Sequence, residues 1–101
     1  MPKYSNFKVE DHYLYFTSEC IVEAMHAHAS DRRLTEAGSA KFWVMENGDT
    51  VVANPGNLTN SQIKGIQRYI KKNLISMCTV WANFKGLKDI SEIEFRNKNT
   101  K

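Results

Sequence analysis

The feature that most constrains the fold is a long amphipathic pattern in the second half of the chain. Apolar residues recur every three or four positions between residues 63 and 84, which is the spacing of one helix face. They are Ile63, Ile66, Ile70, Leu74, Met77, Trp81 and Phe84. Thr59 and Gln62 have the spacing of a capping box before the pattern, and Gly86 follows it as a stop signal. The sequence therefore predicts one long helix whose apolar face needs a partner surface.

The first half of the chain has the pattern of short β-strands that can supply this surface. Residues 7–9 and 13–16 are rich in aromatic and β-branched side chains and predict two short strands joined by a tight turn. Residues 25–30, MHAHAS, alternate strictly and predict a third strand, whose small alanines allow close packing beneath it. Residues 39–46 and 49–53 then predict a hairpin around Asn47-Gly48, with a type I′ turn.

These elements predict an α+β fold in one domain. A small antiparallel sheet of about four to five strands is packed by one long amphipathic helix from the C-terminal half. Residues 87–96, LKDISEIEFR, alternate enough to predict a possible extra C-terminal strand. We expect residues 1–96 to form the single domain and residues 97–101 to be a frayed tail.

Composition and charge restrict the class of protein. The 101 residues contain no apolar run of signal-peptide or membrane-span length, so we expect a cytoplasmic protein without membrane contact. Residues 1–49 carry five basic and eight acidic side chains, whereas residues 50–88 carry six basic and no acidic ones. This split favours an anionic ligand or docking between subunits, and it is too mild to predict nucleic-acid binding. Cys20 and Cys78 are isolated, which is the pattern of neither a disulfide framework nor a zinc site.

The stretch HAHASDRR, residues 26–33, is the densest cluster of polar side chains that could do chemistry. A metal site would need a third ligand beside His26 and His28, and the remaining histidine, His12, is distant in sequence. A phosphodiesterase of the kind that uses two His-X-Ser/Thr repeats would need a second repeat, and only one is present. We therefore expect no metal, no cofactor and no catalytic set, and an enzyme remains an alternative.

Anion binding accounts for more of these residues at once. Hydroxyl, imidazole, guanidinium and ammonium groups donate hydrogen bonds to phosphate, and an aromatic ring can stack a base. The expected ligand-binding residues are His26, His28, Ser30, Arg32, Arg33, Lys41, Trp43, Lys64, Arg68 and Tyr69. Lys71 and Lys72 fall on the same helix flank as Lys64 and Arg68. The competing interpretation is that the arginines form a solvated loop, that Trp43 is core or interface, and that this flank is a solvated helix face.

The order of these motifs resembles the family catalogued as domain of unknown function 4160, which comprises small proteins of bacteria and mobile elements. The resemblance covers roughly residues 10–84, in the stretches HAHASDRRLTEAGSAKFWV, NGDTVV and LTNSQIKGIQRYIKKNLISMCTVWANF. The matching residues are His26, His28, Lys41, Trp43, Asn73 and Trp81. The resemblance implies the same β-then-α architecture, and for activity it implies only a candidate toxin–antitoxin component. Residues 86–101 depart from common members and are interpreted as a candidate oligomerisation element.

Together these observations predict a non-enzymatic homo-oligomer that binds and sequesters an anionic, nucleotide-derived small molecule. By analogy, small phage proteins of similar size act as sponges for nucleotide signals in anti-defence. The first alternative is a toxin–antitoxin-type protein-interaction module. The second is a metal-dependent or phosphodiesterase-like enzyme built on His26 and His28.

Overall fold

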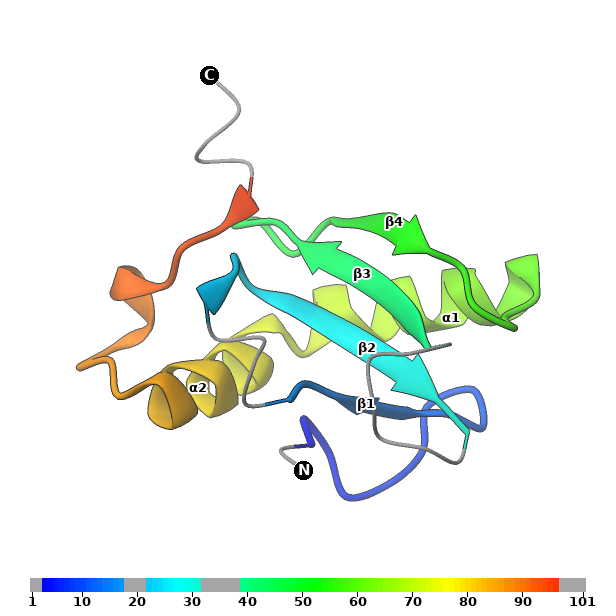
Figure 1. Cartoon of the computed structure of the whole chain (residues 1–101), viewed down its shortest axis with the longest axis horizontal. Helices are drawn as coiled ribbons and strands as arrows, with labels where there is room; N and C mark the ends of the chain where they lie inside the picture. The colour runs from blue at the N-terminus through cyan, green and yellow to red at the C-terminus, as the bar shows by residue number, and fades with distance from the viewer. Residues whose placement is uncertain (1–2, 18–21, 32–38, 97–101) are drawn as a thin grey trace.

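A four-stranded antiparallel sheet is followed in the chain by two helices (Figure 1). The computed structural model describes residues 3–17, 22–31 and 39–96. The strands lie in the order in which they occur in the chain, so each connection joins neighbours. The strands are β1 (Tyr13–Tyr15), β2 (His26–Ser30), β3 (Ala40–Val44) and β4 (Thr50–Asn54), and the helices are α1 (Asn60–Lys72) and α2 (Leu74–Lys85). The predicted α+β class is confirmed.

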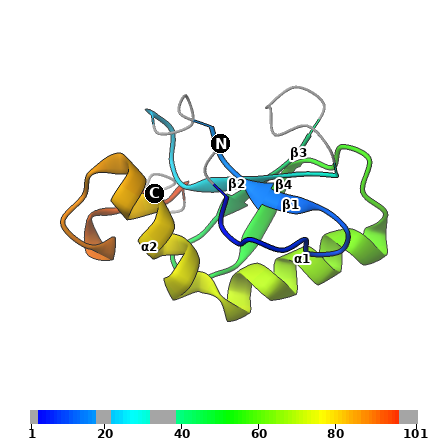
Figure 2. The same ribbon diagram turned by 90° about the horizontal axis from the view of Figure 1, so that it is seen from below.

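Helix α1 runs along one face of the sheet, as Figure 2 shows. The sheet residues that face it alternate along the strands and belong to one buried cluster with the helix residues Ile66 and Ile70. Ala27, which is fully buried, lies opposite Phe42 in the β2–β3 register. The small side chains Ala27 and Ala29 of β2 are buried in this cluster.

The single long helix that we predicted is in fact two helices that meet at Asn73. Its backbone angles, φ −114° and ψ 27°, are not helical. The amide of the Asn73 side chain donates to the Tyr69 carbonyl at 2.9 Å, and the backbone N–H of Asn73 uses the same acceptor. The side chain of Asn73 thus shares the carbonyl that its own backbone N–H uses, and α1 ends at residue 72 while α2 begins at residue 74. The end of α2 before Gly86, which has φ +82°, agrees with the prediction.

The hairpin around Asn47-Gly48 forms between β3 and β4, but its turn is not type I′. Gly48 has φ +92°, whereas Asn47 is not among the described residues with positive φ. Gly48 donates to Met45 O at 3.0 Å and Met45 donates to Asp49 O at 2.8 Å, the pattern of a three-residue loop that ends in a left-handed glycine. Left-handed geometry at both central positions occurs instead between Val9 and His12, where Glu10 and Asp11 have φ +52° and +63°.

Two further strand predictions are wrong. Residues 7–9 form no strand, and only an isolated bridge joins Val9 to His12. Residues 87–96 contain a 3₁₀ turn, Ile90–Glu92, instead of a strand. This segment is nevertheless anchored, because Met25 donates to Glu94 O at 3.0 Å and both Ile93 and Phe95 are buried. In this segment, the alternation of apolar residues corresponds to buried positions and not to a strand.

Two matters remain from the sequence: the segments that the structure does not describe, and the expected lack of a membrane span. Residues 32–38, which include Arg32 and Arg33, and the expected tail over residues 97–101 lie outside the described residues. Within the described ranges, neither helix is long and apolar enough to cross a membrane.

The start of α1 gives a test of the capping box. Thr59 Oγ1 accepts from the Gln62 N–H at 3.2 Å, and Gln62 Oε1 accepts from the Thr59 N–H at 2.9 Å. Thr59→Ala removes one of these acceptors and should lower the free energy of unfolding by about 1 kcal/mol in urea denaturation. Thr59→Ser keeps the hydroxyl and should remain close to wild type. Equal losses in the two variants would show that the hydroxyl does not matter.

Candidate functional site

The predicted ligand-binding residues divide between the two sides of the sheet. His26, His28, Lys41 and Trp43 alternate with the residues that contact α1, so they lie on the face away from that helix. Lys64 and Arg68 belong to α1, on the opposite side. The structure therefore does not bring the histidine strand and the basic helix flank into one site.

On the face away from α1, the predicted residues of β2 and β3 are direct neighbours. His28 pairs with Lys41, and His26 pairs with Trp43, in the β2–β3 register. Tyr15 of β1 pairs with His28 on the other side, with the two ring centroids 5.7 Å apart. Strand alternation predicted this shared face, and the register confirms that the four side chains adjoin.

The two histidines are parts of the packed interior of this face. Their exposed fractions are 1% for His26 and 3% for His28. His26 Nδ1 lies 2.8 Å from the Ala24 carbonyl, which can only accept, so Nδ1 carries the proton. The His26 ring also meets the Trp81 ring at 5.6 Å. His28 Nδ1 lies 3.2 Å from Ser39 Oγ. Both side chains thus have structural partners in the interior.

Lys41 is held by an acidic partner that the sequence did not reveal. Lys41 Nζ lies 2.8 Å from Glu23 Oε1 and 4.3 Å from the centroid of the Trp43 ring. The Arg96 guanidinium lies 4.6 Å from the same ring. The hydrogen bond from Lys41 lowers the pKa of Glu23, and the charges of Lys41 and the histidines act in the same direction against the effect of burial. Much of the Lys41 charge is therefore compensated inside the protein.

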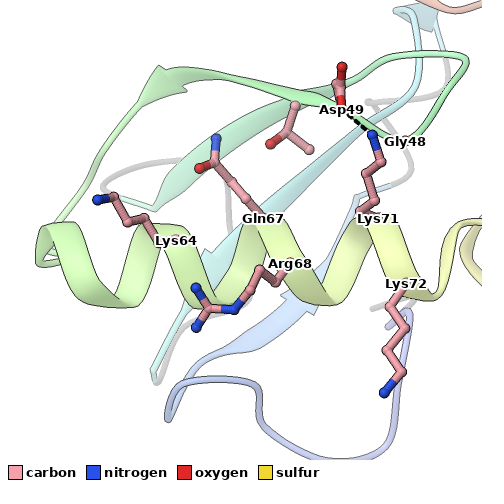
Figure 3. Close-up of a pocket in the computed structure, with 8 residues that line it drawn as sticks. Gly48, Asp49, Lys64, Gln67, Arg68, Lys71 and Lys72 are labelled. Carbon is pink, nitrogen blue, oxygen red and sulfur yellow. Dashed lines mark hydrogen bonds and ion pairs between the residues drawn. The ribbon is translucent and has the colours of Figure 1, made fainter.

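A groove lies on the other side of the molecule, between the β3–β4 hairpin and α1 (Figure 3). Its volume is about 740 Å³. The lining residues come from the turn, from the start of β4 and from one flank of α1: Gly48, Asp49, Thr50, Lys64, Gln67, Arg68, Lys71 and Lys72. The basic flank predicted from helical spacing is thus one wall of a groove, and the hairpin is the other.

The groove has a strong positive excess. Its lining includes one acidic side chain, Asp49, and four basic ones, and Lys71 Nζ lies 2.6 Å from Asp49 Oδ1. This contact lowers the pKa of Asp49, with a further contribution from Asn47. Within the described ranges, no carboxylate lies within ion-pair distance of Lys64, Arg68 or Lys72. Figure 3 shows that Lys71 and Gln67 point toward the hairpin, whereas Arg68 and Lys72 point to the other side of the helix.

The remaining predicted residues lie apart from this groove. Tyr69 meets the exposed ring of Phe7 edge-on at 6.1 Å and does not line the groove. Ser30 ends β2 on the histidine face, and Arg32 and Arg33 lie outside the described residues. Sequence reasoning missed Asp49, Thr50 and Gln67, because only the hairpin's docking on α1 makes them neighbours of the lysines.

The described residues offer no metal centre and no activated thiol. No group of three or more His, Cys, Asp or Glu side chains is placed to hold a metal in residues 3–17, 22–31 and 39–96. Cys78 is buried with its Sγ 3.8 Å from Met25 Sδ. Burial raises the pKa of Cys78 to about 11, which keeps it protonated and unreactive at neutral pH.

Fold and site together define a small α+β domain that carries a basic groove between a β-hairpin and a helix. No family model, no curated protein and no solved structure matches this chain. Membership of the family catalogued as domain of unknown function 4160 therefore stays a prediction from the motifs.

The Glu23–Lys41 pair predicts a specific pH dependence. Because the pKa of Glu23 in the folded protein lies below the ordinary value of a glutamate, 4.5, the pair stabilises the fold above about pH 4.5. This stabilisation is lost as the pH falls through the folded-state pKa. Glu23→Gln should therefore lower the melting temperature at pH 7, by the equivalent of at most about 1 kcal/mol for a partly exposed pair. At pH 2.5 the variant and the wild type should melt together.

The control for this prediction is Lys41→Gln, which should raise the pKa of Glu23 in a carboxyl NMR titration. A melting difference between Glu23→Gln and wild type that is the same at both pH values would contradict the assignment.

Proposed function

We propose that this protein binds an anionic, nucleotide-derived small molecule through its phosphate groups in the groove between the hairpin and α1. The observation that carries the proposal is the charge of the groove, whose lining includes four basic side chains and one carboxylate. Bound in this way, the ligand is sequestered and is not transformed. This places the binding site on the helix side, away from the histidines that the sequence brought forward.

The charges of the groove favour a ligand with several negative charges. Lys64, Arg68 and Lys72 have no carboxylate partner among the described residues, so a phosphate would provide counter-charge that the chain does not. All four basic side chains are exposed, and salt screens such charges over about 10 Å at 0.1 M. We therefore expect binding that weakens steeply as salt is added.

The neutral groups of the groove can add direction to this attraction. Thr50 and Gln67 offer a hydroxyl and an amide beside the lysines. The Arg68 guanidinium can hold a phosphate through two parallel hydrogen bonds. No aromatic ring lines the groove, since Trp43 lies on the opposite face and Tyr69 packs against Phe7. Selectivity should accordingly follow the phosphate groups more than the base.

The groove is poorly equipped for acid–base chemistry. Among the described residues, its lining contains no histidine and no cysteine. Its carboxylate, Asp49, has a lowered pKa because of the contact with Lys71, so it is a weak base at neutral pH. The histidine pair, the basis of the enzyme alternative, is buried on the other face. These features support binding without turnover.

Substitutions in the groove test the proposal. Arg68→Gln and Lys64→Gln should each weaken binding about tenfold or more, since a hydrogen bond to a charged group contributes roughly 1.5–3 kcal/mol. Titration calorimetry with pyrophosphate, ADP-ribose and a cyclic dinucleotide measures the affinity. Recovery of the intact ligand after denaturation checks that no turnover occurs.

Two control variants separate the possible sites. Lys85→Gln in α2 removes an equal charge outside the groove and should leave affinity nearly unchanged. Lys41→Gln probes the opposite face. If Lys41→Gln abolishes binding while Arg68→Gln does not, the ligand binds beside Trp43 and the groove proposal is wrong. No heat and no thermal shift with any of the three probes at low salt would also reject it.

A further inference from the structure

The two edges of the sheet differ in how the chain covers them. The outer edge of β1 is covered by the N-terminal segment, because Tyr4 donates to Leu14 O at 2.9 Å and Lys3 bridges to Tyr15. At the other edge, β4 pairs with β3 alone. Across residues 3–17, 22–31 and 39–96, no backbone hydrogen bond joins the outer side of β4 to another segment. Figure 1 shows β4 as the last strand of the sheet.

The sequence of β4 lacks two of the features that usually protect an exposed edge. Its five residues, TVVAN, carry no charge and no proline. Val51 is 51% exposed on the face away from α1, beside Trp43 in the register. A register shift at the β3 residues Lys41 and Phe42 places an extra residue, Ala53, in β4. The irregularity thus affects only the end of the strand and leaves Thr50 to Val52 regular.

The pairing of β4 with β3 determines which backbone groups of β4 point outward. The Met45 N–H donates to Asp49 O, so these two residues stand at the position of a hydrogen-bonded pair, although the Asp49 N–H itself donates to Asn47 Oδ1. Such pairs alternate along antiparallel strands, so Val51 uses its backbone groups toward β3. Thr50 and Val52 therefore direct their N–H and C=O groups away from the sheet. The outward N–H and C=O groups of these two residues can pair with those of the same two residues in a second identical strand, if that strand approaches in the antiparallel direction.

We propose that β4 pairs with β4 of a second copy of this chain, about a twofold axis at Val51. In this register Thr50 of one copy pairs with Val52 of the other, and the two exposed Val51 side chains face each other. The axis is perpendicular to the sheet, so the four strands of each copy join into one continuous antiparallel sheet. Because so short a strand buries little area, we expect a dissociation constant in the micromolar range. The proposal does not depend on anion binding in the groove.

Oppositely charged substitutions at Val51 test both the proposed dimer surface and its strand register. Val51→Lys places like charges opposite each other in a homodimer, and so does Val51→Glu, so each variant should be monomeric at concentrations where wild type is dimeric. An equimolar mixture of the two variants should form a 1:1 heterodimer, because Lys then faces Glu. Sedimentation equilibrium gives the masses, and circular dichroism confirms that each variant is folded.

The matched controls are Ile75→Lys and Ile75→Glu, which change another exposed aliphatic residue, on α2, and should leave the dimer intact. A wild-type chain that remains monomeric up to about 1 mM, corresponding to less than roughly 4 kcal/mol of association free energy, overturns the proposal. So does a wild-type dimer whose mass is unchanged by Val51→Lys. Two monomeric variants that fail to associate when mixed also overturn the pairing about Val51.

Discussion

The packing of α1 on the alanine-rich face of the sheet is the interaction on which the rest of the structure depends. Ile66 and Ile70 are fully buried, and they belong to one buried cluster with Ala27 and Ala40 of the sheet. This contact determines which face of each strand is directed toward α1. It also places the basic flank of α1 beside the β3–β4 hairpin, so the groove is a consequence of core packing.

Much of this arrangement is readable from the sequence because burial imposes periodicity. The three-to-four spacing of the isoleucines predicts the apolar face of α1, and the strict alternation in MHAHAS predicts which side of β2 is polar. Capping by Thr59 and termination at Gly86 are local effects with local signals, and both were predicted. The side of the helix on which Lys64 and Arg68 lie follows from the same spacing.

The features that sequence reasoning missed depend on local competition or on distant partners. The break at Asn73 arises because one side-chain amide competes for a backbone carbonyl, a small energy difference inside a pattern that otherwise continues. The ion pairs of Lys41 with Glu23 and of Lys71 with Asp49 join residues 18 and 22 positions apart, and no spacing rule connects them. The histidines show the same dependence on distant parts of the chain. Alternation gave their face correctly, yet only the fold shows that this face is packed over them.

The groove and the open edge of β4 share a residue, Thr50, and so are physically connected. In a dimer about Val51, the perpendicular axis keeps the α1 helices of both copies on the same side of the joined sheet. The basic flanks would then be closer to each other than in separate monomers, and their repulsion would oppose association. A polyanion bound in the groove offsets that repulsion, so binding and pairing would each favour the other by the same free energy. The strand β4 itself carries no charge. The charges near the pairing edge therefore come from the α1 flanks and from the ligand.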